Sequence, residues 1–389
     1  MHCPYKNSCN MFGLLRDNPA LVLWKNSYCD SDYGGCRRYM REGLGKKVEE
    51  NLLPDGVLLS PIKGLNSNGS ERHNEDDLRV MTNSFDAALK NLSVIEDARH
   101  RELESFSRFV PDQFLRFLHK DSLADVELGD AVEKYMGVMF SDIRNFTHLS
   151  EEMSVLDNFR FMNSYLMRMG PIIRKHNGFV DKFIGDEIMA LFENGADDIT
   201  EAAVDLQQEL KEYNIHRAKT GYIPLRIGIG LHVGVLMLGT VGSRDRLQTT
   251  VIGDTVNIAA RLEGMTKFYR VPILLSDAIY KSLWNPDSFR LREIDSVKVK
   301  GKEKPLVLYE LYDSDLEEIR DKKDETRAEF YLGRALYIAG EFAEAKENFL
   351  KCSQACPEDR VARLYVRRCE YLMANPPDQG WAGISRVKQ

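Results

Sequence analysis

The stretch Phe179–Phe192, FVDKFIGDEIMALF, holds two short apolar segments separated by three residues that favour turns. The segments Phe179–Ile184 and Ile188–Phe192 have the length and the branched and aromatic content typical of β-strands. The residues between them, Gly-Asp-Glu, are typical of a tight turn. The pattern predicts a β-hairpin with Asp186 at its tip.

Strand and helix patterns alternate on both sides of this hairpin. Further strands are expected at Tyr135–Phe140 and Leu225–His232, and apolar residues recur at helical spacing in Asp157–His176, Ile199–Arg217 and Thr255–Phe268. The order β-α-β-β-α-β predicts an α/β (α+β) sandwich with a mainly antiparallel sheet.

Charge and hydropathy disfavour two classes of protein. The formal net charge of −7 argues against a nucleic-acid binder, because such proteins usually carry a basic excess. The most apolar stretch, Ile227–Val241, contains four glycines and His232 and is too short for a membrane-spanning helix. We expect two short buried strands joined at a turn there. The first residues contain no apolar segment of the kind found in secretory signals, so we expect a cytoplasmic protein without a membrane span.

Shifts in composition divide the chain into successive parts. They are a Cys-rich unit at 1–56, a polar linker at 57–78, a helical stalk and lead-in at 79–130, the α/β region at 131–312, a helical region at 313–375 and a tail at 376–389. Residues 61–78 are rich in Gly, Ser and Asn, which favours a flexible linker, although an ordered surface loop would also fit. The stalk helix would either pair two chains or lie on the α/β region as an amphipathic helix.

Residues 326–359 carry the pattern of one tetratricopeptide repeat, which consists of two antiparallel helices. The positions that fit the pattern are Leu332, Gly333, Gly340, Phe342, Ala345, Phe349 and Pro357. A single repeat cannot bury its own apolar face. We therefore expect it to pack on the helix predicted at Val361–Met373, on the α/β region, or on a partner protein.

Two aspartates lie at the ends of predicted strands, where side chains from different strands can meet. Asp142 follows an apolar strand in FSDIRNFT (140–147), and Asp186 is at the hairpin tip. Adjacent carboxylates repel each other unless a cation lies between them. Two-metal sites that act on phosphates use such pairs, and Mg²⁺ accepts a few carboxylates together with substrate phosphates. Either aspartate alone would fit a turn or a helix cap equally well.

Residues 131–312 resemble the catalytic domain of class III adenylyl and guanylyl cyclases. The motifs occur in the family order and are FSDIRNFT (140–147), DKFIGDEIMALF (181–192), IGIGLHVGVLMLGTVG (227–242), TVIGDTVNIAARLE (250–263) and VKVKGK (297–302). The resemblance implies a ferredoxin-like βαββαβ domain that makes a cyclic nucleotide and pyrophosphate from a nucleoside triphosphate.

The resemblance also implies the roles of individual residues. The implied site consists of the metal ligands Asp142, Ile143 (through its carbonyl) and Asp186 for two Mg²⁺ or Mn²⁺ ions, the purine-selecting Lys182 and Thr250, the transition-state pair Asn257 and Arg261, and the phosphate-binding Lys300. Lysine at 182 resembles adenylyl cyclases, whereas guanylyl cyclases carry glutamate there. With Thr250 it resembles the subgroup that includes bicarbonate-responsive enzymes. ATP is the implied substrate, because lysine can donate to adenine N1 while the threonine hydroxyl accepts from the 6-amino group.

Each of these polar residues also has an ordinary structural interpretation. Asn257 and Arg261 are one helical turn apart and would fit a solvated helix face. Lys300 lies in VKVKGKEK, which would fit an exposed strand, and Lys182 alternates with apolar neighbours as a surface lysine would. The motifs taken together favour the functional interpretation.

A homodimer follows from the resemblance. Lys182 and Asp186 are only four residues apart, yet in the family such residues serve different active sites. One subunit would supply the aspartates and the other the nucleotide contacts, so a two-fold dimer would form two shared sites. Gly242–Gln248 resembles an arm that embraces the partner, although it would also fit an ordinary polar loop.

Four cysteines lie near the start of the chain. Cys3 and Cys9 are spaced C-x5-C, and Cys29 and Cys36 are spaced C-x6-C, which is atypical of zinc modules. Binding of Zn²⁺ or an iron–sulfur cluster is one interpretation, and free buried thiols are the other.

The sequence favours an adenylate cyclase that is regulated through its flanking regions. Three alternatives remain, namely a guanylate cyclase, a catalytically silent module that dimerises or binds nucleotide, and a scaffold built around the helical repeat. Lys182 disfavours the first, and the full set of expected polar residues disfavours the second.

Overall fold

The computed structural model describes residues 110–243, 245–298, 304–377 and 380–385, together with positions 3, 4, 9, 12, 21–22, 25–30, 35–44, 47–48, 52–54, 90 and 96. The chain forms two compact units, Met1–Val94 and Ile95–Gln389. Lys300, the predicted linker and nearly all of the predicted stalk lie outside the described residues. No described helix has the length and apolar character needed to cross a membrane.

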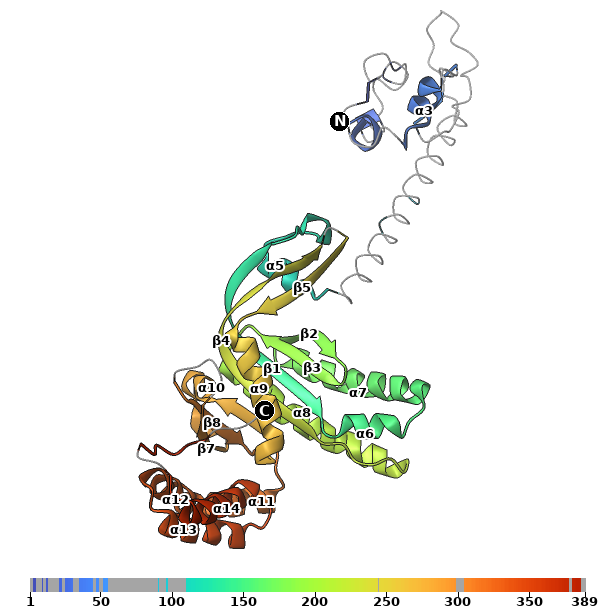
Figure 1. Ribbon diagram of the computed structural model, residues 1–389. Helices are drawn as coiled ribbons and strands as arrows, with labels where there is room; N and C mark the ends of the chain where they lie inside the picture. Colours follow the sequence, from blue (N-terminus) through green and yellow to red (C-terminus); the bar gives the residue numbers. More distant parts are fainter. Residues whose placement is uncertain are drawn as a thin grey trace, which may run out of the picture. The chain divides into compact units, whose positions relative to one another are not determined.

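The second unit is built on a single mixed sheet, which Figure 1 shows at the centre of the unit. Its strands are β1 (Ala131–Ile143), β2 (Gly178–Ile184), β3 (Glu187–Phe192), β4 (Ile227–Ser243), β5 (Arg246–Ile252), β6 (Ile273–Ser276), β7 (Leu291–Val297), β8 (Leu306–Leu311) and β9 (Ile384–Ser385). The order is β2-β3-β1-β4-β6-β8-β7-β9, and β5 pairs with β4. All pairings are antiparallel except β4 with β6 and β7 with β9. The predicted mainly antiparallel α/β fold is therefore confirmed.

Helices cover both faces of the sheet (Figure 1). They are α5 (Asp112–Phe117), α6 (Phe146–Glu151), α7 (Val155–Lys175), α8 (Ala196–Lys219), α9 (Asp254–Tyr269) and α10 (Asp277–Ser282), with 3-10 turns at Leu123–Asp125 and Pro286–Ser288. On α7, Phe161, Tyr165, Met169 and Ile173 recur every four residues and pack with α8 against one face. The helices α5 and α9 pack against the other face.

The expectation of two short strands within Ile227–Val241 is wrong. These residues belong to the single strand β4, which pairs with β1 continuously from Ile227 opposite Ile143 to Gly239 opposite Ala131. The glycines have a packing role instead of a turn role. A Cβ atom on Gly230 would lie 2.5 Å from the Ala259 carbonyl oxygen of α9, so glycine lets the helix backbone approach the strand.

The helical region packs on the catalytic sheet. It consists of α11 (Glu317–Glu325), α12 (Arg327–Ala339), α13 (Phe342–Ala355) and α14 (Arg360–Ala374). The helices α12 and α13 lie where the two repeat helices are predicted, and α14 follows at the predicted position. One apolar core joins Leu274, Ile294 and Leu308 of the sheet to Phe330 and Phe349 of the helices. The tetratricopeptide assignment itself stays a prediction.

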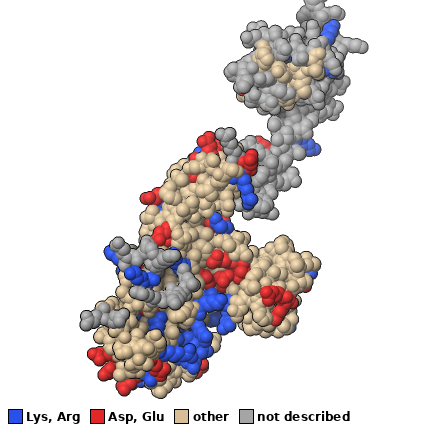
Figure 2. All heavy atoms as spheres, viewed as in Figure 1, with Lys and Arg blue, Asp and Glu red and all other residues tan. Residues whose placement is uncertain are grey.

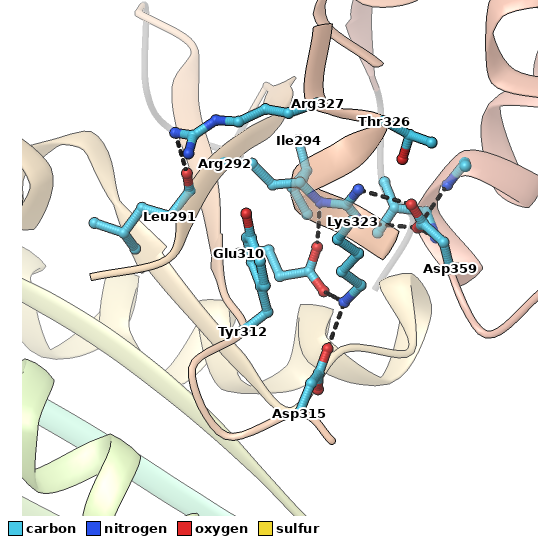
Figure 3. Close-up of polar contacts among 12 residues, drawn as sticks. Leu291, Arg292, Ile294, Glu310, Tyr312, Asp315, Lys323, Thr326, Arg327 and Asp359 are labelled. Atoms are coloured by element: carbon cyan, nitrogen blue, oxygen red, sulfur yellow. Dashed lines mark hydrogen bonds and ion pairs between the residues drawn. The ribbon is translucent and has the colours of Figure 1, made fainter. Parts of the chain in front are cut away.

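Buried ion pairs reinforce this packing (Figure 3). Arg292 of β7 contacts Glu310 of β8 at 2.6 Å and Asp359 at 2.7 Å. Lys323 of α11 contacts the same Glu310 at 2.7 Å and Asp315 at 2.6 Å. Carboxylates of the sheet and of the helical region thus neutralise both Arg292 and Lys323. The helical region is therefore an integral part of the second unit.

The first unit contains the four N-terminal cysteines, a π-helical turn at Lys25–Cys29 and the helix α3 (Arg37–Gly43). All four thiols are free, and Cys3 and Cys9 pack against buried Cys29. Burial, and then the neighbouring thiols, raise the pKa of Cys29 to about 11. Among the described residues, no group of three or more His, Cys, Asp or Glu is arranged to hold a metal ion. Cys29 and Cys36 are buried and Cys3 and Cys9 are partly buried, and the Zn²⁺ or iron–sulfur interpretation gains no support.

Candidate active site

The two predicted metal ligands lie together. Asp142 is near the end of β1, and Asp186 is in the turn between β2 and β3, where Gly185 has a φ of +65°. Because β3 pairs with β1, with Ile188 opposite Ser141, the turn lies beside the end of β1. The Ile143 backbone N–H donates to Asp186 Oδ2 at 3.2 Å. The structure gives no test of the expected metal contact through the Ile143 carbonyl.

Without a cation nearby, the ionised forms of Asp186 and of the neighbouring Glu187 are electrostatically unfavourable. Burial raises the pKa of Asp186 to about 7, with further contributions from a hydrogen bond to Asp142 and from its charge. Burial and the charges of Glu263, Asp142 and Asp186 raise the pKa of Glu187 to about 7 as well. A site that collects carboxylates at this cost is suited to a cation.

Arg144 is the cation closest in sequence to the pair. Its Nη1 donates to Glu263 Oε1 of α9 at 2.9 Å, so one end of this guanidinium is already neutralised. Its backbone N–H donates to the Arg226 carbonyl at 2.8 Å, which fixes the loop after β1 to the start of β4. Glu187, Glu263 and Arg226 could not be recognised as site residues from the sequence, because a single charged residue beside a strand or on a helix has no distinguishing pattern.

A basic cleft adjoins this end of β1. A cavity of about 670 Å³ is lined by residues that include Arg144, Asn145, Arg226, Lys267 and Arg270. A second cavity, of about 640 Å³, shares Arg144, Asn145, Arg226 and Lys267. Figure 2 shows Lys and Arg side chains gathered next to acidic side chains on one face. Neither Asp142 nor Asp186 lines these cavities, but a cleft with this charge is suited to binding a phosphate chain.

The two predicted purine-selecting residues are in direct contact. Lys182 Nζ of β2 donates to Thr250 Oγ1 of β5 at 2.6 Å, although the residues are 68 positions apart. The same Nζ lies 3.2 Å from Asp181 Oδ2. The fold therefore brings this pair together, and its role in purine selection stays a prediction.

The predicted transition-state pair lies on α9. This helix begins after Gly253 and is anchored to β4 by the Thr255 hydroxyl, which donates to the Val235 carbonyl at 2.6 Å. Asn257 is exposed and Arg261 is partly buried, one turn further along the helix. Lys300, the predicted phosphate ligand, lies outside the described residues.

Comparison with known proteins agrees with this geometry. Residues 131–312 match the family model described as the adenylate and guanylate cyclase catalytic domain. These residues are therefore a catalytic domain of the adenylate and guanylate cyclase family.

Two curated relatives of this chain are named adenylate cyclases. An adenylate cyclase of Anabaena cylindrica is 41% identical over 242 residues, which are 61% of this chain and 48% of the relative. A terminal-differentiation-specific adenylate cyclase of Dictyostelium discoideum is 35% identical over 278 residues, which are 70% of this chain and 13% of the relative. The chain thus spans about half the length of the first relative and a small part of the second.

A solved structure shares the fold over a longer stretch than the catalytic domain alone. A bacterial light-regulated adenylyl cyclase is 27% identical, with a TM-score of 0.50, and the match covers 58% of this chain and 64% of that chain.

Proposed function

We propose that this protein is an adenylate cyclase that converts ATP to 3′,5′-cyclic AMP and pyrophosphate. The observation that carries the proposal is the 2.6 Å hydrogen bond from Lys182 to Thr250 within a cyclase catalytic domain. This contact places a cationic donor and a hydroxyl acceptor side by side. The two curated relatives that are named adenylate cyclases support the same purine.

The Lys182–Thr250 pair has the hydrogen-bonding pattern that adenine requires. The lysine ammonium keeps further donors for adenine N1, and the threonine hydroxyl keeps a second lone pair for the 6-amino group. Guanine would present a protonated N1 to the ammonium and a carbonyl oxygen near the hydroxyl. The resulting mismatch would cost about 1–3 kcal/mol.

Asp142 and Asp186 are the residues that we propose to hold two divalent ions. The raised pKa of Asp186 fits this role, because a cation between the carboxyl groups would relieve the repulsion that raises it. Two carboxylates with substrate phosphates are a usual ligand set for Mg²⁺. When bound, the ions would make the ribose 3′-hydroxyl a better nucleophile and would neutralise charge on the leaving pyrophosphate.

The remaining residues would orient the nucleotide. Arg144, Arg226 and Lys267 line the cleft and would bind phosphate oxygens. Asn257 would orient the ribose, and Arg261 would donate to the phosphate oxygens on which charge develops. Reaction requires the 3′-hydroxyl, the α-phosphorus and the leaving oxygen to be in line, so alignment by these groups is the main contribution of the protein.

We also propose that the active form is a homodimer with two shared sites. Large apolar side chains are exposed on the two strands that carry the purine pair and on β4, which pairs with β5, namely Phe183 and Ile184 on β2, Ile252 on β5, and Val235 and Met237 on β4. Exposed apolar side chains that gather near a functional site are typical of a surface that contacts another chain. A second copy would cover this surface and supply the nucleotide contacts for the first copy's aspartates.

Four finer predictions accompany this function. They are a response to bicarbonate, a protein partner for the helical region, a cytoplasmic location, and either a bound Zn²⁺ or iron–sulfur cluster or free thiols at Cys3, Cys9, Cys29 and Cys36. Metal analysis and an absorption spectrum of anaerobically purified protein decide the last of them, and protein without bound zinc or iron would exclude the metal interpretation.

The test of the main proposal is incubation of the purified full-length chain with ATP or GTP and Mg²⁺ or Mn²⁺, followed by chromatographic detection of the cyclic product. We expect cyclic AMP from ATP and its loss in Asp186→Asn. Asp321→Asn, a change of the same kind at an exposed position on α11, is the matched control and should retain activity. Formation of cyclic GMP without cyclic AMP would overturn the purine assignment, and no cyclic product under any condition would overturn the enzyme proposal.

A further inference from the structure

The strand β2 is irregular next to the purine pair. Val180 pairs with Ala190 of β3, and Lys182 pairs with Met189, so Asp181 is an extra residue in a β-bulge. Successive side chains of a regular strand point to opposite faces of the sheet. The Asp181 and Lys182 side chains nevertheless meet, with Oδ2 3.2 Å from Nζ. The bulge accounts for this contact, because bulges redirect side chains and are common beside active sites.

The Asp181 side chain is fully buried, with 0% of its surface exposed. Within the described part of the chain, neither of its carboxylate oxygens accepts a hydrogen bond, so the contact with Lys182 is an ion pair without hydrogen-bond geometry. Burial raises the pKa of this carboxyl group, and the neighbouring ammonium lowers it in part. A buried carboxylate with so few partners is unfavourable for folding, since an apolar residue would fill the position at a lower cost. Its presence therefore points to a function that involves the Lys182 ammonium.

We propose that Asp181 is a positioning residue for purine selection, which holds the Lys182 ammonium against Thr250. The inference rests on the proposed function and adds to it a residue that the nucleobase need not touch. Lys182 is bracketed by Asp181 at 3.2 Å and Thr250 at 2.6 Å, and its side chain is only partly exposed. The two contacts fix the position of Nζ, and a lysine ammonium acts only as a donor toward the base.

Discrimination between adenine and guanine depends on that fixed position. A charged lysine at a fixed distance meets an acceptor in adenine and a donor in guanine at N1. Without the Asp181 charge, the ammonium can move away from Thr250 toward solvent. It then no longer has to face the protonated N1 of guanine. Loss of Asp181 should therefore reduce catalysis with ATP more than catalysis with GTP.

The experiment measures kcat/KM for ATP and for GTP with the full-length chain and three single variants. For Asp181→Asn we expect the ATP-to-GTP ratio to fall about tenfold, the size of one charge-assisted contact. Asp181→Glu keeps the charge and should retain part of the ratio. Asp205→Asn is the matched control, because Asp205 also pairs with a lysine, Lys175 at 2.7 Å, but lies on α8. An unchanged ratio in folded Asp181→Asn would overturn the proposal, since a purely structural role lowers both rates together.

A second comparison keeps the proposal testable if Asp181→Asn does not fold. The double change Asp181→Asn with Lys182→Met removes both charges, and it is compared with Lys182→Met alone. If Asp181 acts through Lys182, the two proteins should have the same ATP-to-GTP ratio, and a further change in the double variant would contradict the inference. Absence of any cyclic product from the unmodified chain would instead refute the proposed function, so the two failures are distinguishable.

Discussion

Arg292 and Asp359 form a two-point ion pair inside the protein, with both nitrogen–oxygen distances at 2.7 Å. Their side chains are 2% and 0% exposed. Arg292 belongs to β7 of the catalytic domain, whereas Asp359 is the N-cap of α14 and also accepts from the Val361 and Ala362 backbone N–H groups. One buried carboxylate therefore starts the last helix and attaches it to the sheet (Figure 3).

Asp359→Ala should destabilise the second unit strongly. The change leaves the Arg292 guanidinium buried with Glu310 as its one remaining close counter-charge among the described residues, and it removes the cap of α14. Breaking a buried pair in this way typically costs about 3–5 kcal/mol. Thermal unfolding followed by circular dichroism would show a clearly lower midpoint. Glu318→Ala is the control, because Glu318 forms a solvent-exposed pair with Lys322 that contributes little to stability. Equal midpoints for the two variants would contradict the prediction.

Gly230 and Gly264 should respond in opposite directions to the same substitution. In Gly230→Ala the new methyl group would meet the Ala259 carbonyl and the Glu263 backbone of α9. We expect a loss of about 1–3 kcal/mol from overpacking, together with lower activity because α9 carries Asn257 and Arg261.

At Gly264, within α9, a methyl group would meet nothing within 4 Å. Gly264→Ala should therefore stabilise the protein by about 0.5–1 kcal/mol through helix propensity. Midpoints of thermal unfolding for both variants decide the question, and a destabilised Gly264→Ala protein would show that α9 packs differently.

The local elements could be predicted from the sequence because their patterns are local. The two apolar segments of Phe179–Phe192 and the four-residue spacing in α7 are features of the local sequence, and both predictions are confirmed within a few residues. The glycines of Ile227–Val241 misled the prediction, because at Gly230 the glycine is required by the backbone of α9, which is more than twenty residues away in sequence. Nothing in the strand itself distinguishes a glycine that a helix requires from one that a turn requires.

The residues of the candidate site also divide into those that the local sequence places and those that only the folded structure places. Asp142 and Asp186 could be placed together because both follow strand ends, which meet at one edge of a sheet. Asp181 precedes Lys182 in the sequence, yet its burial and its contact with Lys182 depend on a bulge that no alternation pattern predicts. Arg226 lies in an ordinary sequence context, and its position in the basic cleft depends on the pairing of β4 with β1.

Ionisation of Asp186 should make the metal-free protein less stable as the pH rises from about 4 to about 7. Its pKa is 3.8 ordinarily and about 7 in the folded protein, chiefly because of burial. In this interval the folded state holds a proton that the unfolded state has released, so the free energy of unfolding decreases with increasing pH. Glu187 contributes in the same direction.

Added Mg²⁺ should reverse this trend, because the cation binds the ionised pair. The rise in unfolding midpoint that Mg²⁺ causes, relative to EDTA, should be small at pH 5.5 and larger at pH 8. Asp186→Asn should lose most of the Mg²⁺ effect at both values. An Mg²⁺ effect that is equal at the two pH values in the unmodified protein would argue against ion binding by this pair.

Mixing two inactive variants should restore activity if each site is shared between subunits. Asp142→Ala lacks a metal ligand, and Arg261→Ala lacks the donor on α9. In a mixed dimer, one site takes both defects and the other takes none, so one intact site remains. Random pairing at equal amounts makes half of the dimers mixed, and the expected recovery is about a quarter of the unmodified activity. Cyclic AMP formation as a function of the mixing ratio measures it.

The matched control is a mixture of Asp142→Ala with Asp186→Ala. Both aspartates of a site come from the same subunit, at the adjoining ends of β1 and the β2–β3 turn. Each site of that mixed dimer therefore lacks one metal ligand, and no recovery is expected at any ratio. Recovery in the first mixture but not in the second assigns the aspartates and Arg261 to different subunits. Recovery in neither mixture, with dimers present by sedimentation, would mean that each chain builds its site alone.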